Sequence, residues 1–484
     1  MAITTINLSS LDGSNGFRLD GVATDDSSGD SVSNAGDVNG DGLGDVIVGA
    51  FGADPNGDSS GSSYVVFGKT SGFDATMDLS GLDGTNGFRL DGEADPQPGM
   101  YSIRMSSVSN AGDINGDGFD DVLVGADFRD HTSAIYPSDA GLSYVVFGKS
   151  SGFSPTLDLS NLDGSNGFLL TRLSGVSNAS SAGDINGDGF DDLILGAPTP
   201  FTVGGLDASY IVFGKAGGFS AQMSASSLDG NNGFRLIGGA AYDRLGSSVS
   251  SAGDINGDGF DDVLVGAPGA DPNGNNSGSI YVVFGKIGGF GATLDLSSLD
   301  GNNGFRLDGA SAGRGSGFLV SNAGDVNGDG FDDVIVGGSY VVFGKASGFD
   351  ATLDLSSLDG SNGFRLDGAG LVSDAGDVNG DGFDDVILGA SFADPNGTYS
   401  GSSYVVFGKA SGFSATINLS DLDSNAGVRL DGVAAFDYSG ASVSGAGDVN
   451  GDGFDDLIIG APGSVWHSYL NDINGAGASY IVFG

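Results

Sequence analysis

The sequence predicts an all-β protein, a seven-bladed β-propeller of four-stranded antiparallel blades, from three observations. Turn formers dominate, with 91 Gly in 484 residues, while Glu93 is the single Glu. Many turn formers and few helix formers favour β structure. Three phrases recur seven times in the same order, with a period of about 70 residues, which suits one propeller blade rather than a solenoid rung.

The recurring phrases predict four strands in each blade. Small residues, as in 246–253, precede an Asp-rich loop and suit an innermost strand A, where blades crowd around the axis. The apolar run after the loop predicts strand B, Tyr-Val-Val-Phe-Gly predicts strand C, and Gly-Phe-Arg-Leu predicts strand D. Between C and D, Leu-x-x-Leu-Asp-Gly fits either a helical turn ended by Gly or an extra strand, and the sequence leaves this open.

The order of the phrases predicts how the ring closes. The chain begins with a D phrase and ends with a C phrase, so residues 1–21 are expected to supply the outer strand of blade 7. This closure leaves no free sheet edge in the ring. We therefore expect residues 1–484 to form a single propeller domain.

The Asp-rich loops have the oxygen pattern of calcium sites. They begin at residues 37, 113, 184, 254, 325, 377 and 448. In the second loop, positions 1, 3, 5 and 9 are Asp113, Asn115, Asp117 and Asp121, and position 7 offers the carbonyl of Phe119. Ca²⁺ takes six to eight oxygen ligands at about 2.3–2.6 Å. Three facing carboxylates are costly without a cation, so we predict up to seven bound Ca²⁺.

These loops are not EF-hands, because position 12 is Val124 where an EF-hand carries a bidentate Glu. A plain Asn-Gly turn explains one copy, but not the same Asp positions in seven. Asp120, at position 8, is interpreted as a solvated side chain or one that only supports the ligands. The predicted metal ligands are Asp37, Asn39, Asp41, Leu43, Asp45, Asp113, Asn115, Asp117, Phe119, Asp121, Asp184, Asn186, Asp188, Phe190, Asp192, Asp254, Asn256, Asp258, Phe260, Asp262, Asp325, Asn327, Asp329, Phe331, Asp333, Asp377, Asn379, Asp381, Phe383, Asp385, Asp448, Asn450, Asp452, Phe454 and Asp456.

Charge and composition limit the classes of partner and compartment. A formal net charge of −46 argues against binding to nucleic acid or anionic membrane. No apolar stretch is long enough for membrane insertion, and the chain contains no Cys. We expect an extracellular or cell-surface protein, and Met1-Ala-Ile-Thr-Thr is not a signal peptide, so we interpret the chain as an excised domain or a leaderless one.

The loop sequence Asp-x-Asn-Gly-Asp-Gly-x-x-Asp, where Gly-Ala-Pro follows it, resembles the FG-GAP repeat. That repeat builds the seven-bladed propeller of integrin α subunits. The clearest copies are 196–198, 266–268 and 460–462, whereas the fifth blade has Gly337-Gly338 instead. The resemblance implies calcium sites between strands A and B, a cell-surface setting, and a binding rather than catalytic role. It does not imply heterodimer formation, because no leg domains follow the repeats.

In antiparallel blades, the B–C and D–A loops lie on the face opposite the A–B loops. We expect a protein or glycan partner there. The residues that depart from the repeat on this face, and that we predict as a ligand site, are Phe128, His131, Tyr136, Arg104, Trp466, His467 and Tyr469. Drift in unconstrained loops is the plain alternative. Trp, Tyr and Arg are favoured anchors of interfaces.

Three functions fit the sequence to different degrees. An adhesion, surface-interaction or structural module fits best, and a carbohydrate-binding lectin-type propeller is the alternative. A polysaccharide-active enzyme is the least favoured, because two His and one Glu leave few acid–base groups. We predict no catalytic residues.

Overall fold

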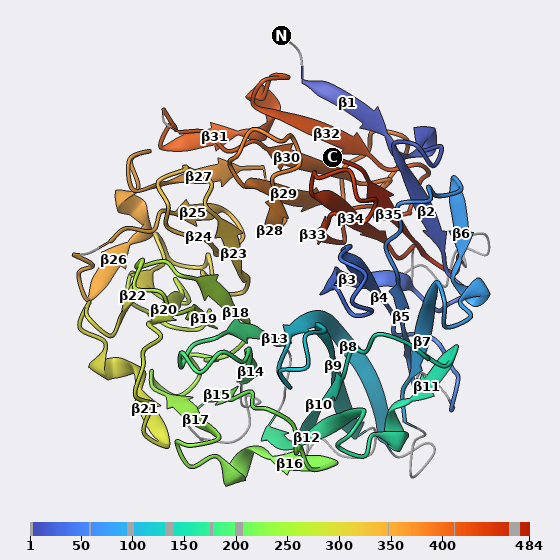
Figure 1. Cartoon of the computed structure of the whole chain (residues 1–484). Helices are drawn as coiled ribbons and strands as arrows, with labels where there is room; N and C mark the ends of the chain where they lie inside the picture. Colours follow the sequence, from blue (N-terminus) through green and yellow to red (C-terminus); the bar gives the residue numbers. More distant parts are fainter. Residues whose placement is uncertain are drawn as a thin grey trace.

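A computed structural model of the chain describes residues 3–57, 60–93, 101–130, 140–174, 178–198, 207–346, 348–368, 370–410, 412–463 and 475–484; for 101–104, 127–130, 140 and 172–174 it describes only the backbone. Seven sheets stand around a central axis, one for each repeat (Figure 1). The predicted all-β, seven-bladed propeller is confirmed. Within the described residues, no helix has the length and apolar character of a membrane span.

Each sheet has five strands rather than the four predicted. Strands A to D run from the axis outward, and A pairs with B, B with C, and C with D, all antiparallel. The A strands are β3 (Ser28–Gly36), β8 (Tyr101–Gly112), β13 (Asn178–Gly183), β18 (Val249–Gly253), β23 (Val320–Gly324), β28 (Leu371–Gly376) and β33 (Ser442–Gly447). The B strands are β4 (Asp45–Ala50), β9 (Asp121–Asp130), β14 (Asp192–Ala197), β19 (Asp262–Ala267), β24 (Asp333–Val336), β29 (Asp385–Ala390) and β34 (Asp456–Ala461).

Strands C and D complete the antiparallel part of each blade. The C strands are β5 (Ser62–Val66), β10 (Ala140–Val146), β15 (Ala208–Val212), β20 (Ser279–Val283), β25 (Tyr340–Val342), β30 (Ser402–Val406) and β35 (Ala478–Val482). The D strands are β7 (Gly87–Asp91), β12 (Gly167–Ser174), β17 (Gly233–Ile237), β22 (Gly304–Asp308), β27 (Gly363–Asp367), β32 (Gly427–Asp431) and, from the N-terminus, β2 (Gly16–Asp20). The order β33-β34-β35-β2 confirms that an N-terminal strand completes blade 7.

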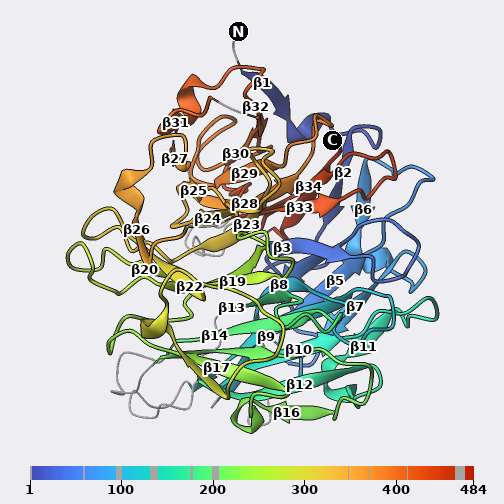
Figure 2. The ribbon, with the colours of Figure 1, turned by 60° about the vertical axis from the view of Figure 1, so that its left-hand side comes forward.

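The fifth strand of each blade comes from the next repeat and runs parallel to strand D. After strand C, the chain crosses back to the preceding blade, adds this short strand, and then returns to its own blade as strand D. The fifth strands of blades 1 to 7 are β11 (Thr156–Asp158), β16 (Gln222–Ser224), β21 (Thr293–Asp295), β26 (Thr352–Asp354), β31 (Thr416–Asn418), β1 (Thr4–Asn7) and β6 (Thr76–Asp78). These strands stay at the periphery when the ring is turned (Figure 2).

The phrase Leu-x-x-Leu-Asp-Gly begins with the helical turn and the extra strand lies just before it, which resolves the alternative that the sequence left open. A 3₁₀ helix follows each fifth strand, capped by the strand's last side chain. In η2, the Asp78 carboxylate accepts a hydrogen bond from the Ser80 N–H at 2.8 Å. The seven are η1 (Leu8–Ser10), η2 (Leu79–Gly81), η3 (Leu159–Asn161), η4 (Ala225–Ser227), η5 (Leu296–Ser298), η6 (Leu355–Ser357) and η7 (Leu419–Asp421).

The N-terminal segment divides between two blades, which refines the predicted closure. β2 pairs with β35, with Arg18 opposite Tyr480. β1 pairs with β32 of blade 6, with Thr5 opposite Arg429. Residues from the start of the chain thus hold both blade 6 and blade 7.

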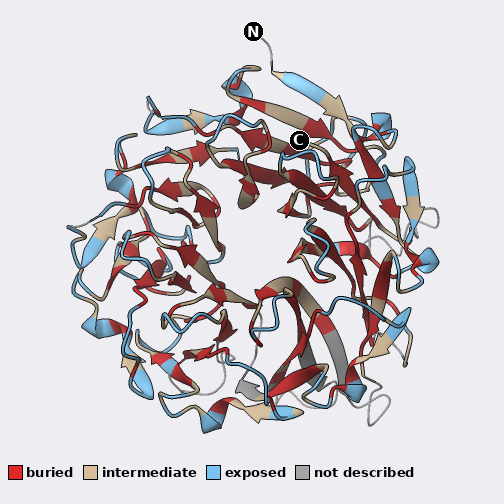
Figure 3. Cartoon of the chain, viewed as in Figure 1, coloured by how far each residue is buried: buried red, intermediate tan, exposed pale blue. Residues whose placement is uncertain are grey.

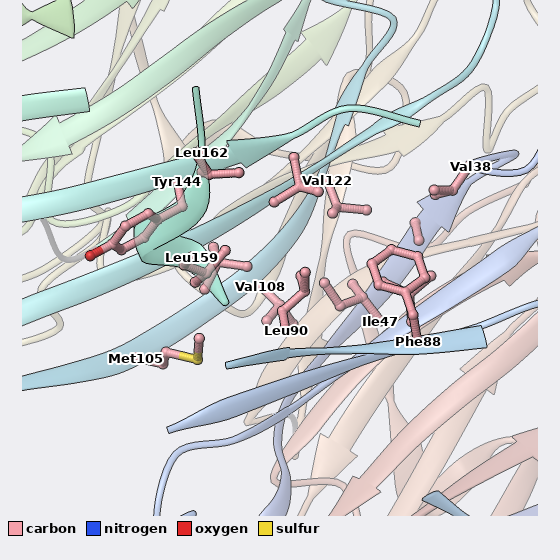
Figure 4. Close-up of a cluster of buried hydrophobic side chains, with 14 of the residues drawn as sticks. Val38, Ile47, Phe88, Leu90, Met105, Val108, Val122, Tyr144, Leu159 and Leu162 are labelled. Carbon is pink, nitrogen blue, oxygen red and sulfur yellow. The ribbon is translucent and has the colours of Figure 1, made fainter. Parts of the chain in front are cut away.

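Strands B and C are largely buried (Figure 3). The hydrophobic core lies between blades, because these strands present apolar side chains on both faces. Between blades 1 and 2, Ile47 and Phe88 pack with Val122 and Tyr144, and all four are at most 1% exposed (Figure 4). Leu123, the neighbour of Val122 on the same strand, packs on the other side, against blade 3. Full burial of such side chains contributes about 1.5–3 kcal/mol each, so each blade is stabilised by both of its neighbours.

Candidate metal centres and the opposite face

The A–B loop of blade 2 folds around the carboxylate of its first residue. Asp113 Oδ1 accepts hydrogen bonds from the N–H groups of Gly116 at 2.7 Å and Asp117 at 3.0 Å, and Oδ2 accepts one from Gly118 at 2.8 Å. The two glycines have φ of 72° and 87°, a conformation that a side chain disfavours. The Asp117 carboxylate accepts a hydrogen bond from the N–H of Phe119 at 3.2 Å. This explains the Asp and Gly positions of the loop phrase.

The last residue of the loop, Asp121, is a fully buried carboxylate that ties the loop to the sheet. Its Oδ1 accepts a hydrogen bond from the N–H of Gly148, after strand C, at 2.9 Å. Its Oδ2 accepts one from the N–H of Ile114 at 3.2 Å. The Asn115 side-chain amide lies 3.3 Å from Oδ2 and 3.4 Å from Oδ1. Positions 2, 3 and 9 of the loop are thus held together around one carboxylate.

The loop brings three carboxyl groups near one another, and one of them, Asp121, is fully shielded from water. Burial raises the pKa of Asp121 to about 9, the Gly148 hydrogen bond opposes that rise, and the nearby carboxylates of Asp117 and Asp113 add to it. The pKa of the equivalent group is raised in every blade, mainly by burial. It is about 8 for Asp45, Asp192 and Asp333, about 9 for Asp262, and about 7 for Asp385 and Asp456.

The chemistry of the loop fits a hard cation. Its donors are carboxylate, amide and carbonyl oxygens, the set that Ca²⁺ prefers, and a bound cation would relieve the cost of ionising the buried Asp. Each carboxylate oxygen has two lone pairs, so accepting an N–H bond leaves room for a metal. As the described side chains stand, however, no three His, Cys, Asp or Glu groups are grouped closely enough to hold a metal. The predicted calcium ligands therefore remain a prediction.

Position 8 refines the interpretation of Asp120 as a solvated side chain or one that supports the ligands, because the half-buried side chain supports the loop of the neighbouring blade. Its Oδ2 accepts a hydrogen bond at 2.7 Å from the N–H of Asp37, the first residue of the loop in blade 1. The N–H of Asp120 in turn lies 3.2 Å from the Asp37 carbonyl oxygen. The same carboxylate contact joins Asp113 to Asp191, Asp184 to Asp261, Asp254 to Asp332, Asp325 to Asp384, and Asp377 to Asp455.

A second contact joins neighbouring loops. A Cβ added at Gly116 would lie 2.1 Å from the Phe190 ring of the next loop. The fourth residue must therefore be Gly both for its backbone conformation and to admit that ring. At the joint between blades 7 and 1, Gly44 replaces the position-8 Asp, and only the backbone bond from Gly44 N–H to the Asp448 carbonyl, at 2.9 Å, is made. The A–B loops thus form a chain of contacts with one weaker joint.

The position-8 contact gives a testable prediction. Asp120→Ala leaves the part-buried N–H of Asp37 without its side-chain acceptor, so we expect the free energy of unfolding to fall by about 1–3 kcal/mol. Asp120→Asn keeps an acceptor oxygen and should stay within about 1 kcal/mol of wild type. Chemical denaturation in calcium measures both. Asp74→Ala, at an exposed Asp, controls for loss of charge; an equal effect there would contradict the assignment.

The ligand-face residues predicted from the sequence lie outside what the structure describes. His131, Tyr136 and the loop residues Trp466, His467 and Tyr469 are not described. Arg104 and Phe128 are described only as backbone of β8 and β9, where Arg104 is opposite Asp127 and Phe128 opposite Ile103. That ligand site stays a prediction.

Sequence reasoning missed a group of aromatic residues on the same face, in blade 6. Phe392 and Tyr399 come from its B–C loop, and Phe436 and Tyr438 from the D–A loop that follows. The Tyr399 and Tyr438 rings stack with centroids 5.5 Å apart. Phe392 lies edge-on to both, at 5.6 and 5.9 Å, and is 71% exposed. We call these four residues the aromatic cluster.

Two backbone features fix the aromatic cluster. The N–H groups of Phe436 and Tyr438 donate to the carbonyls of Thr398 and Tyr399, at 2.8 and 3.0 Å. Tyr399, Phe436 and Tyr438 also have φ of 53°, 68° and 53°, in the left-handed region. Positive φ at the two D–A positions recurs in other blades, at Asp25 and Ser27 and at Tyr242 and Arg244, so this conformation belongs to the loop of the repeat. The corresponding positions of blade 4 carry residues that adopt this conformation easily: Asn276, Gly313 and Gly315.

Comparison with known proteins agrees with this architecture. The FG-GAP repeat model matches residues 106–146, 177–212, 245–283, 369–406 and 439–482. Integrin alpha-4 of Xenopus laevis is 31% identical over 160 residues, which are 32% of this chain and 14% of that protein. Integrin alpha pat-2 of Caenorhabditis elegans is 29% identical over 252 residues, 49% of this chain and 18% of that protein. Integrin alpha-PS5 of Drosophila melanogaster is 35% identical over 162 residues, 33% and 14%.

The chain thus aligns with only a small part of these curated relatives. A crystal structure of the V. cholerae biofilm matrix protein Bap1 aligns with 14% identity and a TM-score of 0.22, which is too low to carry an argument. The matched repeats each span strands A to C with their A–B loop, and they fall in blades 2, 3, 4, 6 and 7. The chain is a seven-bladed β-propeller with FG-GAP repeats and a homologue of the integrin alpha subunits.

Proposed function

We propose that this protein is a calcium-stabilised extracellular β-propeller that acts as an adhesion or surface-interaction module. The observation that carries the proposal is the A–B loop, present in all seven blades, in which a buried Asp stands beside two further carboxylates. A Ca²⁺ in each loop would compensate this charge and hold the turn between strands A and B. The integrin alpha relatives support the surface setting.

The partner would bind the face formed by the B–C and D–A loops. Interlocked loops occupy the other face, and changes there would disturb the joints between blades. The aromatic cluster is a rigid, partly exposed set of rings of the kind that dominates protein interfaces. Its loops are already hydrogen-bonded to each other, so binding costs little conformational entropy.

The experiment is a capture assay with the full chain in calcium. Phe392→Ala with Tyr399→Ala should weaken capture of a surface-fraction protein at least tenfold, because hot-spot aromatics contribute about 2 kcal/mol or more. The matched control is Tyr242→Ala with Phe318→Ala, which removes two exposed aromatic side chains from D–A loops of other blades. Trp466→Ala with Tyr136→Ala tests the site predicted from the sequence. Undiminished capture by both test pairs would contradict the proposed face.

A carbohydrate-binding propeller is the second candidate, favoured by the same cluster, since exposed aromatic rings can stack on sugars. A glycan array separates the two functions. Binding of a glycan that is lost in the Phe392→Ala, Tyr399→Ala pair would establish the lectin, and an array without signal would leave a protein partner. A polysaccharide-active enzyme is not proposed, because the acidic groups at the A–B loops serve as hydrogen-bond acceptors within the loops.

A further inference from the structure

The connection between strands B and C is shorter in blade 5 than in blades 4 and 6. Residues 268–278 and 391–401 make this connection in blades 4 and 6, whereas residues 337–339 make it in blade 5. Gly337 and Gly338 have φ of 62° and 64°, the left-handed conformation of a tight hairpin turn. In blade 4, the longer loop lies against the end of strand D, where the Asn273 side-chain amide donates to the carbonyl of Gly309 at 3.0 Å. The turn of blade 5 is too short to reach the corresponding place.

The short turn exposes the ion pair at the end of strand D. The Asp367 side chain is 44% exposed, compared with 8%, 14% and 12% for the corresponding side chains of Asp91, Asp308 and Asp431. In blade 4, Arg306 donates to the paired carboxylate through both Nε and Nη2, at 2.6 and 2.9 Å. In blade 5, Arg365 donates to Asp367 through Nη2, and its Nε has no hydrogen-bond partner among the described residues. Because a guanidinium carries five N–H donors, Arg365 keeps donors for a ligand.

The loop that leads from strand D of blade 4 to strand A of blade 5 carries a reversed charge. In the loops that lead to blades 1, 4 and 7, one position holds an Asp whose carboxylate accepts a backbone N–H at 2.6–2.9 Å, namely Asp26, Asp243 and Asp437. In all four loops, a Gly stands five residues before this position and another stands three residues after it. In the loop to blade 5 the position is Arg314, which is exposed. Blade 5 therefore has a cation where the other loops have a carboxylate that serves the loop itself.

A cavity of about 220 Å³ lies where the short turn and the altered loop meet. The polar side chains among the residues that line it are those of Arg314, Ser316, Ser339, Tyr340, Arg365 and Asp367. Two guanidinium groups and one carboxylate give the cavity a local positive charge, in a chain whose formal net charge is −46. This balance favours an anion, and a carboxylate matches a guanidinium through paired, charge-assisted hydrogen bonds.

The other groups of the cavity define the rest of the ligand. The Asp367 carboxylate only accepts hydrogen bonds, so the ligand must carry donors in addition to its own carboxylate. The hydroxyl groups of Ser316, Ser339 and Tyr340 can donate or accept. A cavity of about 150 Å³ already holds a six-membered ring, so the space exceeds what the side chain of an Asp or Glu would fill. A sugar ring that bears hydroxyl groups and one carboxylate, a uronate, meets all of these requirements.

We propose that this cavity, the blade-5 pocket, binds a uronate unit of a glycan, with the sugar carboxylate on Arg314 and sugar hydroxyl groups on Asp367. Arg365 holds Asp367 in place and supplies further donors. The net charge of the chain repels polyanions, so the glycan is one in which the uronate stands among neutral sugars. The pocket shares no residue with the aromatic cluster, and this inference does not depend on the partner proposed for that cluster.

The test uses the full chain in calcium and the methyl glycosides of glucuronic acid and galacturonic acid. Saturation-transfer NMR and calorimetry should show one site with a dissociation constant of about 1 mM for at least one of them, as for a ligand of few atoms. Methyl glucoside and methyl galactoside, which have a hydroxymethyl group in place of the carboxylate, should bind at least tenfold more weakly. Acetyl-glutamate methylamide represents an acidic peptide and should also bind at least tenfold more weakly. No binding of either uronic acid glycoside at about 10 mM, or equal binding of a neutral glycoside or of the glutamate compound, would overturn the proposal.

Variants that copy other blades place the sugar in the pocket. Arg314→Asp introduces the residue of the other three loops, and Arg365→Leu introduces the residue of blade 2, where Leu169 is opposite Tyr144 as Arg365 is opposite Tyr340. Each variant should weaken binding of the uronic acid glycoside at least tenfold. Arg306→Leu is the matched control, because it makes the second change in blade 4, where the longer B–C loop is present, and it should retain binding. Circular dichroism checks the fold of each variant, and unchanged binding in folded Arg314→Asp or folded Arg365→Leu would refute the site.

Discussion

Chelation of calcium is expected to lower the unfolding temperature by about 10 °C or more at pH 9, and by much less at pH 5. Each bound Ca²⁺ stabilises the folded state by about 3–4 kcal/mol when its concentration is 100–1,000 times its Kd. Seven loops contribute in parallel, and a change of 1 kcal/mol shifts the transition of a domain by a few degrees. Scanning calorimetry with calcium and with a chelator measures the difference.

The pH dependence follows from the buried carboxyl groups. An Asp carboxyl has a pKa near 4 in an unfolded chain, whereas the metal-free folded loops raise it to about 7 to 9, as for Asp385 and Asp121. Between those values the folded state binds more protons than the unfolded state. The unfolding free energy of the metal-free protein therefore falls as pH rises from about 4 to about 9, by up to about 1.4 kcal/mol per pH unit for each carboxyl. Calcium should remove this slope.

Two outcomes would contradict this account. One is a transition temperature that is indifferent to calcium at pH 9, which would mean that the loops bind no stabilising cation. The other is a metal-free protein whose stability rises between pH 5 and pH 9. That result would mean that the carboxyl groups at position 9 are ionised in the folded state without cost. Magnesium is the control cation, because its small size and octahedral demand fit a loop of this kind poorly.

The cost of Asp121→Asn is expected to depend on calcium. In chelator at pH 9 the removal of a buried charge offsets the loss of one of the two oxygens that accept the N–H groups of Gly148 and Ile114, so the net cost should stay below about 2 kcal/mol. In calcium it should cost about 3–4 kcal/mol, the contribution of one lost site. Asp121→Ala should be destabilising in both conditions, since the N–H groups of Gly148 and Ile114 lose their acceptor, at about 1–3 kcal/mol each.

Denaturant titrations of the three proteins, each with calcium and with chelator, give the comparison. Asp74→Asn is the matched control, an exposed Asp outside the loops, and should behave as wild type in both. Equal destabilisation by Asp121→Asn in calcium and in chelator would mean that the residue acts only as a hydrogen-bond acceptor. The calcium assignment of this loop would then fail.

The sequence predicted what local patterns encode. The seven loops, strands A to D and the closure by β2 could be predicted, because turn residues and β-branched runs recur in the same order in every repeat. The fifth strand was missed because it is only three or four residues long, and its own sequence does not indicate that it pairs with another repeat. The Asp120 contact was missed for the same reason, since its acceptor role depends on Asp37 in the neighbouring blade.

The aromatic cluster shows a different limit. Phe392 and Tyr399 flank the common Ala-Asp-Pro-Asn-Gly phrase, which made their loop look like its copies in blades 1 and 4. Phe436 and Tyr438 lie farther along the chain, beyond strands C and D. Only the fold brings the two pairs together. A comparison of aligned loop positions would have been the signal, because both of these loops carry two aromatic residues, whereas the corresponding positions in blade 4 include Asn276, Gly313 and Gly315.

The fifth strands link all seven blades of the ring through main-chain pairing. Each repeat gives one strand to the blade before it, so no blade can be excised between its own strands without stripping an edge from its neighbour. Tension applied to one blade passes to the next through main-chain pairing as well as through side-chain packing. β1 pairs with β32 of blade 6 and β2 pairs with β35 of blade 7, so the N-terminal segment closes the ring. The unit that fails under heat or force is accordingly the whole ring, and a chain lengthened or shortened by whole repeats would have to change the ring's circumference.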